Sequence, residues 1–154
     1  MEFLNSTLFR DVGMSFFADT KFDGIEPICQ PKQASIVLPE DIGDIAVLLT
    51  HPYVGGDDEL GHELLRHFIE NYSYSKARER RLILTYDAVR LACATVSPRC
   101  LEAIYGFVKR NGILLICEVS ARKLGIFDSI KIGRLAGVED IYRCLISSQK
   151  VIRL

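Results

Sequence analysis

Short apolar runs alternate with amphipathic segments from residue 44 to residue 154. The first run, residues 45–50, holds five apolar residues in succession, which is typical of a strand covered on both faces of a sheet. Residues 81–86 and 113–116, which are rich in leucine and isoleucine, are predicted to form two more strands, and residues 130–132 and 151–152 shorter ones. The pattern therefore predicts three strands and two further short ones.

Helices are predicted between these runs. Residues 60–72 carry apolar side chains at the 3.6-residue period, and residues 55–58 (Gly-Gly-Asp-Asp) supply a chain break and a cap before them. A Ser-Pro pair at 97–98 suits the start of a second helix. Its predicted buried stripe comprises Leu101, Ile104, Tyr105 and Val108. A short helix over 119–124 and a last one over 138–146 follow.

This order of elements predicts the fold class. Strands that alternate with helices along the chain form βαβ units, in which neighbouring strands run parallel. We therefore predict a three-layer α/β sandwich of the flavodoxin or Rossmann-like kind, with a mainly parallel sheet of about five strands. Residues 44–154 would form this domain.

The first 43 residues differ from the rest in composition. Residues 1–43 hold five of the eight phenylalanines, with three basic and seven acidic side chains, and they show no long period. We interpret them as an irregular Phe-rich N-terminal extension rather than a second domain. Because so many phenylalanines would not remain in water, we expect the extension to pack on the body or on a neighbouring subunit.

Composition is that of an ordinary globular protein and argues against two classes of partner. The chain of 154 residues is 49% hydrophobic and 25% charged, with a net charge of −1. A general nucleic-acid binder needs a strong positive field, and a membrane span needs about 18 consecutive apolar residues. We therefore expect no nucleic-acid partner and no membrane segment. Because the amino terminus shows no basic and apolar leader, we expect a cytoplasmic protein.

Neither a disulfide framework nor a metal site is expected. Five cysteines are an odd number, and no pair has the short spacing of a zinc site. His62 and His67 are five residues apart, whereas two zinc-binding histidines on one helix face are four residues apart. We interpret both as helix-surface residues, and we predict no cofactor.

A parallel α/β sheet places its functional site beyond the carboxyl ends of the strands. Residues 50–59, 86–90 and 117–122 follow the first three predicted strands. This geometric rule selects these three segments without reference to any motif.

The first of these segments is acidic. Asp57, Asp58 and Glu59 would repel a phosphate group, so this glycine-containing loop is not a phosphate cradle. The acids would instead cap the following helix and interact with its positive end. Alternatively, Asp58 or Glu59 would take part in a polar pocket.

Cys117 differs from the other cysteines in its position. It ends the third strand and precedes a short helix, whose free N–H groups and positive dipole end would stabilise a thiolate. Arg122, one turn later, adds positive charge. We interpret Cys117 as the candidate reactive thiol and Cys93 as the second candidate, and Cys100 and Cys144 as packing residues within helices.

Several segments of residues 44–154 together resemble a known family. They are the strand and acidic glycine loop at 45–61, Tyr-Asp-Ala-Val-Arg-Leu-Ala-Cys at 86–93, Ser-Pro at 97–98, residues 112–117, Gly-Ile at 125–126, Ile-Gly at 132–133 and Lys-Val-Ile-Arg at 150–153. Their order and spacing are similar to those of the DsrE/DsrF-like family, most of all to the version of this domain in selenium-metabolism proteins.

The resemblance implies a parallel α/β fold, assembly into homotrimers or homohexamers, and a cytoplasmic role in sulfur or selenium relay. In active members, a cysteine at the position of Cys117 carries a persulfide that is passed between a sulfur-donor and a sulfur-acceptor protein. The other candidate site residues are Gly55, Gly56, Glu59, Tyr86, Asp87, Cys93, Ser120 and Arg122.

The chain departs from the family at two of these places. Related proteins have Cys-Gly-Thr-Cys where residues 117–120 read Cys-Glu-Val-Ser, so Ser120 replaces the second thiol. Residues 86–88 read Tyr-Asp-Ala where the family has Asn-Ser-Gly. We therefore expect a single-cysteine persulfide carrier rather than a two-thiol mechanism.

Two alternatives to the relay remain open. One is a non-catalytic DsrE-like oligomeric scaffold that has lost the chemistry. The other is a small-molecule binding module that uses the crevice between Thr50, Tyr86 and Cys117.

Overall fold

The computed structural model describes residues 43–93 and 98–154, so residues 1–42 of the predicted extension lie outside the described part. The strands are β1 (Asp44–Leu49), β2 (Glu79–Leu84), β3 (Ile113–Cys117), β4 (Arg134–Ala136) and β5 (Lys150–Arg153). The α-helices are α1 (Glu59–Ser73), α2 (Pro98–Lys109), α3 (Glu118–Lys123) and α4 (Val138–Ser147), and the 3-10 helices are η2 (Tyr86–Ala92) and η3 (Phe127–Ser129). None of the helices described in these two ranges is long and apolar enough to cross a membrane.

The sheet is parallel throughout, with the strand order β4-β3-β2-β1-β5. Val47 in β1 pairs with Leu82 in β2 and with Ile152 in β5. Leu82 in turn pairs with Leu114 in β3. Because the central strands lie between covered faces, both sets of alternating side chains are apolar, which explains the continuous apolar runs in the sequence.

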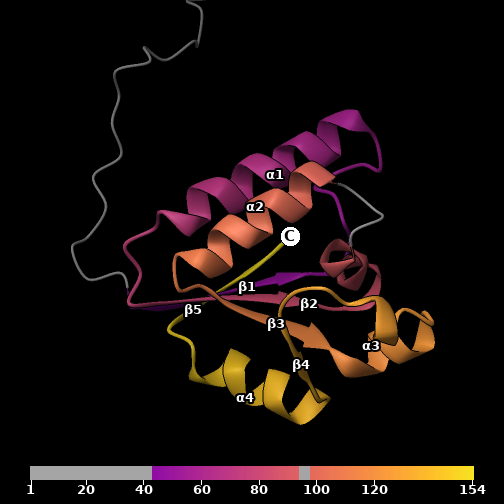
Figure 1. Ribbon diagram of the computed structural model, residues 1–154. Coiled ribbons are helices and arrows are strands. Elements are labelled where there is room, and N and C mark those ends of the chain that lie inside the picture. The colour runs from indigo at the N-terminus through magenta and orange to yellow at the C-terminus, as the bar shows by residue number, and fades with distance from the viewer. Residues whose placement is uncertain (1–42, 94–97) are drawn as a thin grey trace, which may run out of the picture. The chain divides into compact units, whose positions relative to one another are not determined.

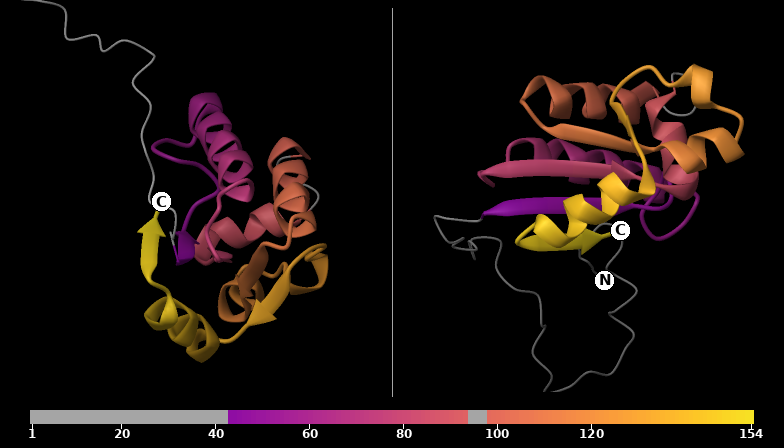
Figure 2. Two further views of the ribbon diagram at one scale, coloured as in Figure 1. Left: turned by 90° about the vertical axis from the view of Figure 1, so that its left-hand side faces the viewer. Right: turned by 90° about the horizontal axis from the view of Figure 1, so that it is seen from below.

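Helices cover both faces of this sheet (Figure 1). α1 and α2 lie side by side on one face, and α4 covers the other, as the view along the strands in Figure 2 also shows. η2 and α3 lie beyond the carboxyl ends of the strands. The predicted three-layer α/β sandwich with a five-stranded parallel sheet is therefore confirmed.

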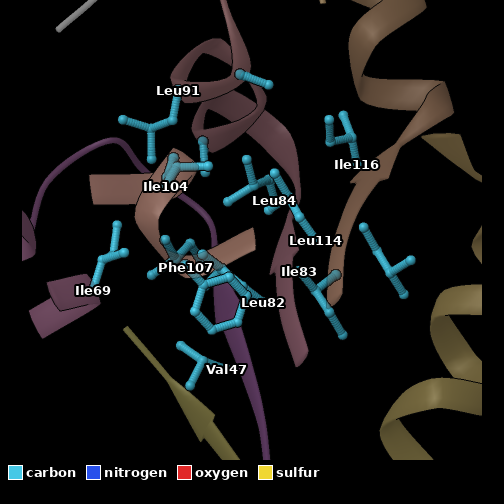
Figure 3. Close-up of a cluster of buried hydrophobic side chains, with 14 of the residues drawn as sticks. Val47, Ile69, Leu82, Ile83, Leu84, Leu91, Ile104, Phe107, Leu114 and Ile116 are labelled. Carbon is cyan, nitrogen blue, oxygen red and sulfur yellow. The ribbon is translucent and has the colours of Figure 1, made fainter. Parts of the chain in front are cut away.

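The main core fills the space between the sheet and the α1–α2 layer (Figure 3). It is built from large apolar side chains that are fully buried. These include Val47, Leu82 and Leu84 from the strands, Ile69 from α1, and Ile104 and Phe107 from α2. Burial of this apolar surface is the dominant force that holds the helices on the sheet.

The buried stripe of α2 differs from the prediction. Ile104 is fully buried as expected, but Tyr105 is 48% exposed. Cys100, Ala103 and Phe107 are buried with Ile104 instead. The helix carries apolar residues on more than one side, so the contact with the sheet and α1 decides which of them is covered.

The fourth strand also lies later in the chain than predicted. Residues 130–132 do not form a strand; Ile130 makes one isolated antiparallel bridge with Cys93, and β4 begins at Arg134. Gly133 separates the two segments with a φ angle of +100°, a conformation that only glycine adopts readily. The chain therefore turns at this glycine immediately before β4 pairs with β3.

Tyr72 links α1 to the sheet through a buried hydroxyl group. The hydroxyl donates to the Ile45 carbonyl over 2.8 Å and accepts from the Arg81 N–H over 3.0 Å. Burial, which disfavours the ionised phenolate, raises the pKa of Tyr72 from 10.0 to about 12.

We expect this shift to make the fold sensitive to alkaline pH. Between about pH 10 and 12 only the unfolded state loses the Tyr72 proton, so the free energy of unfolding falls as pH rises, and the full contribution is present only below pH 10. Tyr72→Phe cannot ionise and should lose stability less steeply across this window. Urea unfolding of both proteins at several pH values measures how steeply the free energy of unfolding falls with pH. Identical slopes for the two proteins would show that Tyr72 does not cause this pH dependence.

Candidate functional site

Three different structures follow the carboxyl ends of the central strands. A loop over residues 50–58 leads from β1 to α1, η2 begins at Tyr86 just after β2, and α3 begins directly after Cys117. η2 and α3 pack against each other beyond the end of the sheet (Figure 1). This edge holds most of the residues that the sequence singled out.

Tyr86 has an unusual backbone conformation for a tyrosine. Its φ angle is +53°, in the left-handed region, which costs a residue with a side chain roughly 1–2 kcal/mol. The Tyr86 N–H donates to Ser120 Oγ over 2.9 Å, and this bond ties η2 to α3. The Tyr86 side chain remains 65% exposed. Residues strained in this way cluster at binding and active sites.

Four rings form a row across this edge, which we call the aromatic row: His62, Tyr53, His51 and Tyr86. Their ring centroids follow one another at 6.0, 5.3 and 5.7 Å. His51 stacks on Tyr53 with nearly parallel planes and meets Tyr86 edge-on. The Nδ1 atoms of His51 and His62 are buried without a hydrogen-bond partner among the described residues. Such atoms are rare in native proteins, so the row is a candidate binding surface.

The glycine loop before α1 serves the helix cap. Asp58 is the N-cap, and its Oδ1 accepts from the Gly61 N–H over 2.8 Å. Gly61 also lets the loop approach the helix closely, since a Cβ at this position would lie 1.8 Å from the Gly56 carbonyl oxygen. Gly55 turns the chain with a φ angle of +87°. The capping interpretation of this loop is confirmed for Asp58.

The two histidines of α1 have different surroundings. His67 is 55% exposed and lies 3.1 Å from Glu63, as expected of a helix-surface residue. His62 differs, because its side chain is only 33% exposed and its Nε2 lies 2.9 Å from Asp57. Glu59, in the first turn of α1, is exposed. Asp57 rather than Asp58 or Glu59 is therefore the acid that reaches the aromatic row.

Cys117 occupies the N-cap position of α3 in extended conformation, without a capping hydrogen bond from its side chain. Its side chain is only 6% exposed. Leu115 lines a cavity together with residues of α4, and alternate residues of a strand share a face. Cys117 therefore points toward the α4 side of the sheet, and its thiol lies inside the fold rather than at an open crevice.

Two charged candidates are engaged in ion pairs within their own helices. Arg122 lies 2.7 Å from Glu118, and its guanidinium carbon lies 3.9 Å above the centre of the Phe127 ring. Asp87 pairs with Arg90 over 3.1 Å. Since Glu118 neutralises Arg122, the structure gives Cys117 less positive charge than the sequence suggested.

The other described cysteines are less suited to chemistry at this edge. Cys93 is 4% exposed, and burial raises the pKa of its thiol, which keeps it protonated at neutral pH. Cys100 is buried in α2, as predicted. Cys144 is partly exposed, but it lies in α4 rather than beyond the carboxyl ends of the strands, and burial raises the pKa of its thiol.

The structure thus brings only some of the predicted residues together. Tyr86 and Ser120 touch, and Cys117 lies three residues before Ser120. Sequence reasoning missed His51 and Tyr53, although both lie in a segment selected for its position after the first strand. Their stacking depends on the conformation of the loop, which no spacing in the sequence reveals.

The bond between η2 and α3 can be tested by removing its acceptor. Ser120→Ala leaves the Tyr86 N–H without this partner and should lower the free energy of unfolding by about 1 kcal/mol. Ser129→Ala, an exposed serine in η3, is the matched control and should change it by less than about 0.5 kcal/mol. Urea unfolding measures both, and equal effects would show that the bond contributes nothing.

Comparison with known proteins gives a match in fold alone. No protein-family model and no curated protein matches the chain. Among solved structures, the ychN protein from E. coli is similar, with a TM-score of 0.55 and 16% sequence identity over 73% of this chain and 100% of that one. At this identity the likeness shows the fold alone, and it agrees with the parallel α/β fold that the sequence resemblance implied.

Proposed function

We propose that this protein is a sulfur or selenium relay protein that carries a persulfide, or its selenium counterpart, on Cys117. One observation carries the proposal: Cys117 lies at the junction of β3 and α3, at the N-cap position. The first N–H groups of a helix have no acceptor within it, and they favour a thiolate or persulfide anion nearby. The sequence resemblance to the DsrE/DsrF-like family supports the same residue.

The proposed transfer needs no oxidant or metal. The Cys117 thiolate attacks the outer sulfur of a donor persulfide, the donor's S–S bond breaks, and the donor leaves as a thiolate. A new S–S bond then holds the transferred sulfur on Cys117. Transfer to an acceptor thiol repeats the same exchange.

Burial of Cys117 sets a condition on this chemistry. A donor reaches a side chain that is 6% exposed only when the surrounding structure opens. α3 is six residues long, and the Ser120–Tyr86 bond is one of its links to the neighbouring element. We therefore propose that displacement of α3 precedes sulfur transfer.

The proposal includes partners. Because Ser120 replaces the second thiol of the loop, the persulfide on Cys117 would pass to a separate sulfur-acceptor protein or to Cys93. A homotrimer or homohexamer in the cytoplasm is the assembly that the resemblance implies. Three apolar residues of α4 are 60–64% exposed, namely Val138, Tyr142 and Ile146. Such exposed apolar surface supports association with another subunit. Light scattering measures the mass; a monomer at all concentrations would contradict this part.

The direct test is to load the whole protein with sulfur. Incubation with a low-molecular-weight persulfide, trapping of the product and peptide mass mapping identify each cysteine that gains 32 Da, the mass of one sulfur atom. We expect the gain on the peptide that contains Cys117. A gain confined to other cysteines, or none at all, would refute the relay function and leave the scaffold alternative.

A second candidate function is small-molecule binding at the aromatic row. The Nδ1 atom of His51 is buried and has no hydrogen-bond partner within residues 43–93 and 98–154, and it lies next to the exposed and strained Tyr86; both observations favour this function. An aromatic ligand would stack on these rings. Thermal-shift screening of aromatic acids and amides tests this function in the unaltered protein and in Tyr86→Ala. A ligand that binds at the aromatic row should stabilise the unaltered protein but not the variant.

A further inference from the structure

A cavity of about 420 Å³ lies between α4 and the strands, away from the candidate site. Its wall includes Arg81 near the start of β2 and Cys144 in α4, so it opens at the amino-terminal half of the sheet. The volume falls in the range of small-molecule sites, roughly 300–1,000 Å³. No residue of the candidate functional site lines it.

Arg81 is held in a fixed position in this wall. Its side chain is only 15% exposed. It forms ion pairs with Glu79 and, over 3.8 Å, with Asp44, and it donates to Ser148 Oγ over 2.9 Å. A guanidinium group that is fixed and partly shielded from water binds an anion with little loss of side-chain entropy.

Arg134 supplies the charge that is still available. It lies in β4, pairs in register with Leu115 and therefore projects to the same face of the sheet. Among the residues that the structure describes, no carboxylate forms an ion pair with Arg134, in contrast to Arg81 and Arg143. Arg143, by contrast, is held on α4 by Glu139 at 2.8 Å and Asp140 at 3.5 Å.

The remaining wall combines charge with apolar surface. Three arginines face two carboxylates, Glu79 and Asp140, and each carboxylate is already paired with an arginine. Ile113 and Leu115 of β3 add an apolar floor. The arrangement suits a ligand that has an anionic head and a small apolar body.

We propose that this cavity binds a small organic anion, whose carboxylate or phosphate group contacts Arg134 and Arg81 while its apolar part lies on Ile113 and Leu115. Arginine recognises both head groups through the same planar pair of donors. This site is separate from the persulfide function and does not depend on it.

Cys144 offers a built-in reporter of occupancy. It lines the cavity and is partly exposed, whereas Cys93, Cys100 and Cys117 are buried. Burial raises the pKa of Cys144, while the charges of Arg81 and Arg134 favour its thiolate. A bound anion would block access to the Cys144 thiol and would also compensate the positive charges of Arg81 and Arg134. Both effects should slow the alkylation of Cys144.

The experiment follows alkylation of Cys144 by iodoacetamide in the full chain, by peptide mass mapping at constant ionic strength. Phenyl phosphate, benzoate and the neutral analogue benzamide are the probes. We expect the two anions, but not benzamide, to slow alkylation at least threefold in a saturable way, and the tighter of the two to identify the preferred head group.

Variants test the part played by the arginine. Arg134→Gln should weaken protection about tenfold, and Arg134→Lys should retain part of it. Arg99→Gln, which removes an exposed arginine in α2 on the other face of the sheet, is the matched control and should leave protection unchanged. Because Arg134 is exposed on an edge strand, these variants should fold, and thermal melting checks that they do.

Three outcomes would overturn the proposal: no protection by either anion, equal protection by benzamide, or unchanged protection in Arg134→Gln. Loading of Cys117 is not measured in this assay. Failure of the anion site and failure of the relay function are therefore distinguishable.

Discussion

Replacing Phe107 by alanine should lower the free energy of unfolding by about 3–5 kcal/mol. The Phe107 side chain is fully buried and stacks on Tyr72, with 5.2 Å between the ring centroids. Gly112 lies against the same ring, since a Cβ there would come within 2.3 Å of it. The truncation therefore removes one of the contacts between α2 and α1 and leaves a cavity in the core.

Urea unfolding followed by far-ultraviolet circular dichroism measures this loss. Tyr105→Ala is the matched control, because Tyr105 is an aromatic residue of the same helix that is 48% exposed; we expect it to cost less than about 1 kcal/mol. Phe107→Leu should fall between the two and keeps the comparison possible if the alanine variant does not fold. A cost below about 1 kcal/mol for Phe107→Ala would show that α2 is not anchored by this ring.

Replacing Cys117 by serine should abolish persulfide loading of this domain. Serine keeps the size and the N-cap position, but its hydroxyl is not a nucleophile toward a persulfide at neutral pH. Cys93→Ser and Cys144→Ser are the controls, and both should load as the unaltered protein does. Loss of loading only in Cys144→Ser would move the chemistry from the β3–α3 junction to α4 and refute the assignment.

The rate of loading tests the requirement for opening. If displacement of α3 limits access to Cys117, then Ser120→Ala, which removes one link between α3 and η2, should increase the loading rate several-fold. The same variant should not change the extent of loading. An unchanged rate would show that access does not depend on this contact.

The strands and the N-terminal cap of α1 are the features that the sequence predicted best. The apolar run at 45–50 predicted a strand covered on both faces, and β1 is the strand between β2 and β5. Asp58 was predicted as a cap and accepts the Gly61 N–H. Such features depend on residues close together in the chain, so the local pattern contains the information.

The candidate site was predictable in place but not in composition. The rule for parallel sheets selected the segments after the first three strands, and His51, Tyr53, Tyr86 and Ser120 lie there. The contact between the Tyr86 N–H and Ser120 spans 34 residues, and the left-handed Tyr86 backbone is adopted against its local preference. Both features depend on a contact between segments that are far apart in the chain, and a single amino-acid sequence does not reveal such a contact.

The amino-acid sequence by itself determined the alternation of strands and helices, because the 2- and 3.6-residue periods follow from backbone geometry. This alternation in turn determined the parallel sheet and the three-layer sandwich. Only the tertiary structure decided which side of α2 is buried, where β4 begins and which face of β3 carries Cys117. These depend on the packing of one element against another, where several apolar faces compete and the fit of the whole core selects among them. For the same reason the arginine-lined cavity beneath α4, whose wall comes from three strands and a helix, is visible only once the chain has folded.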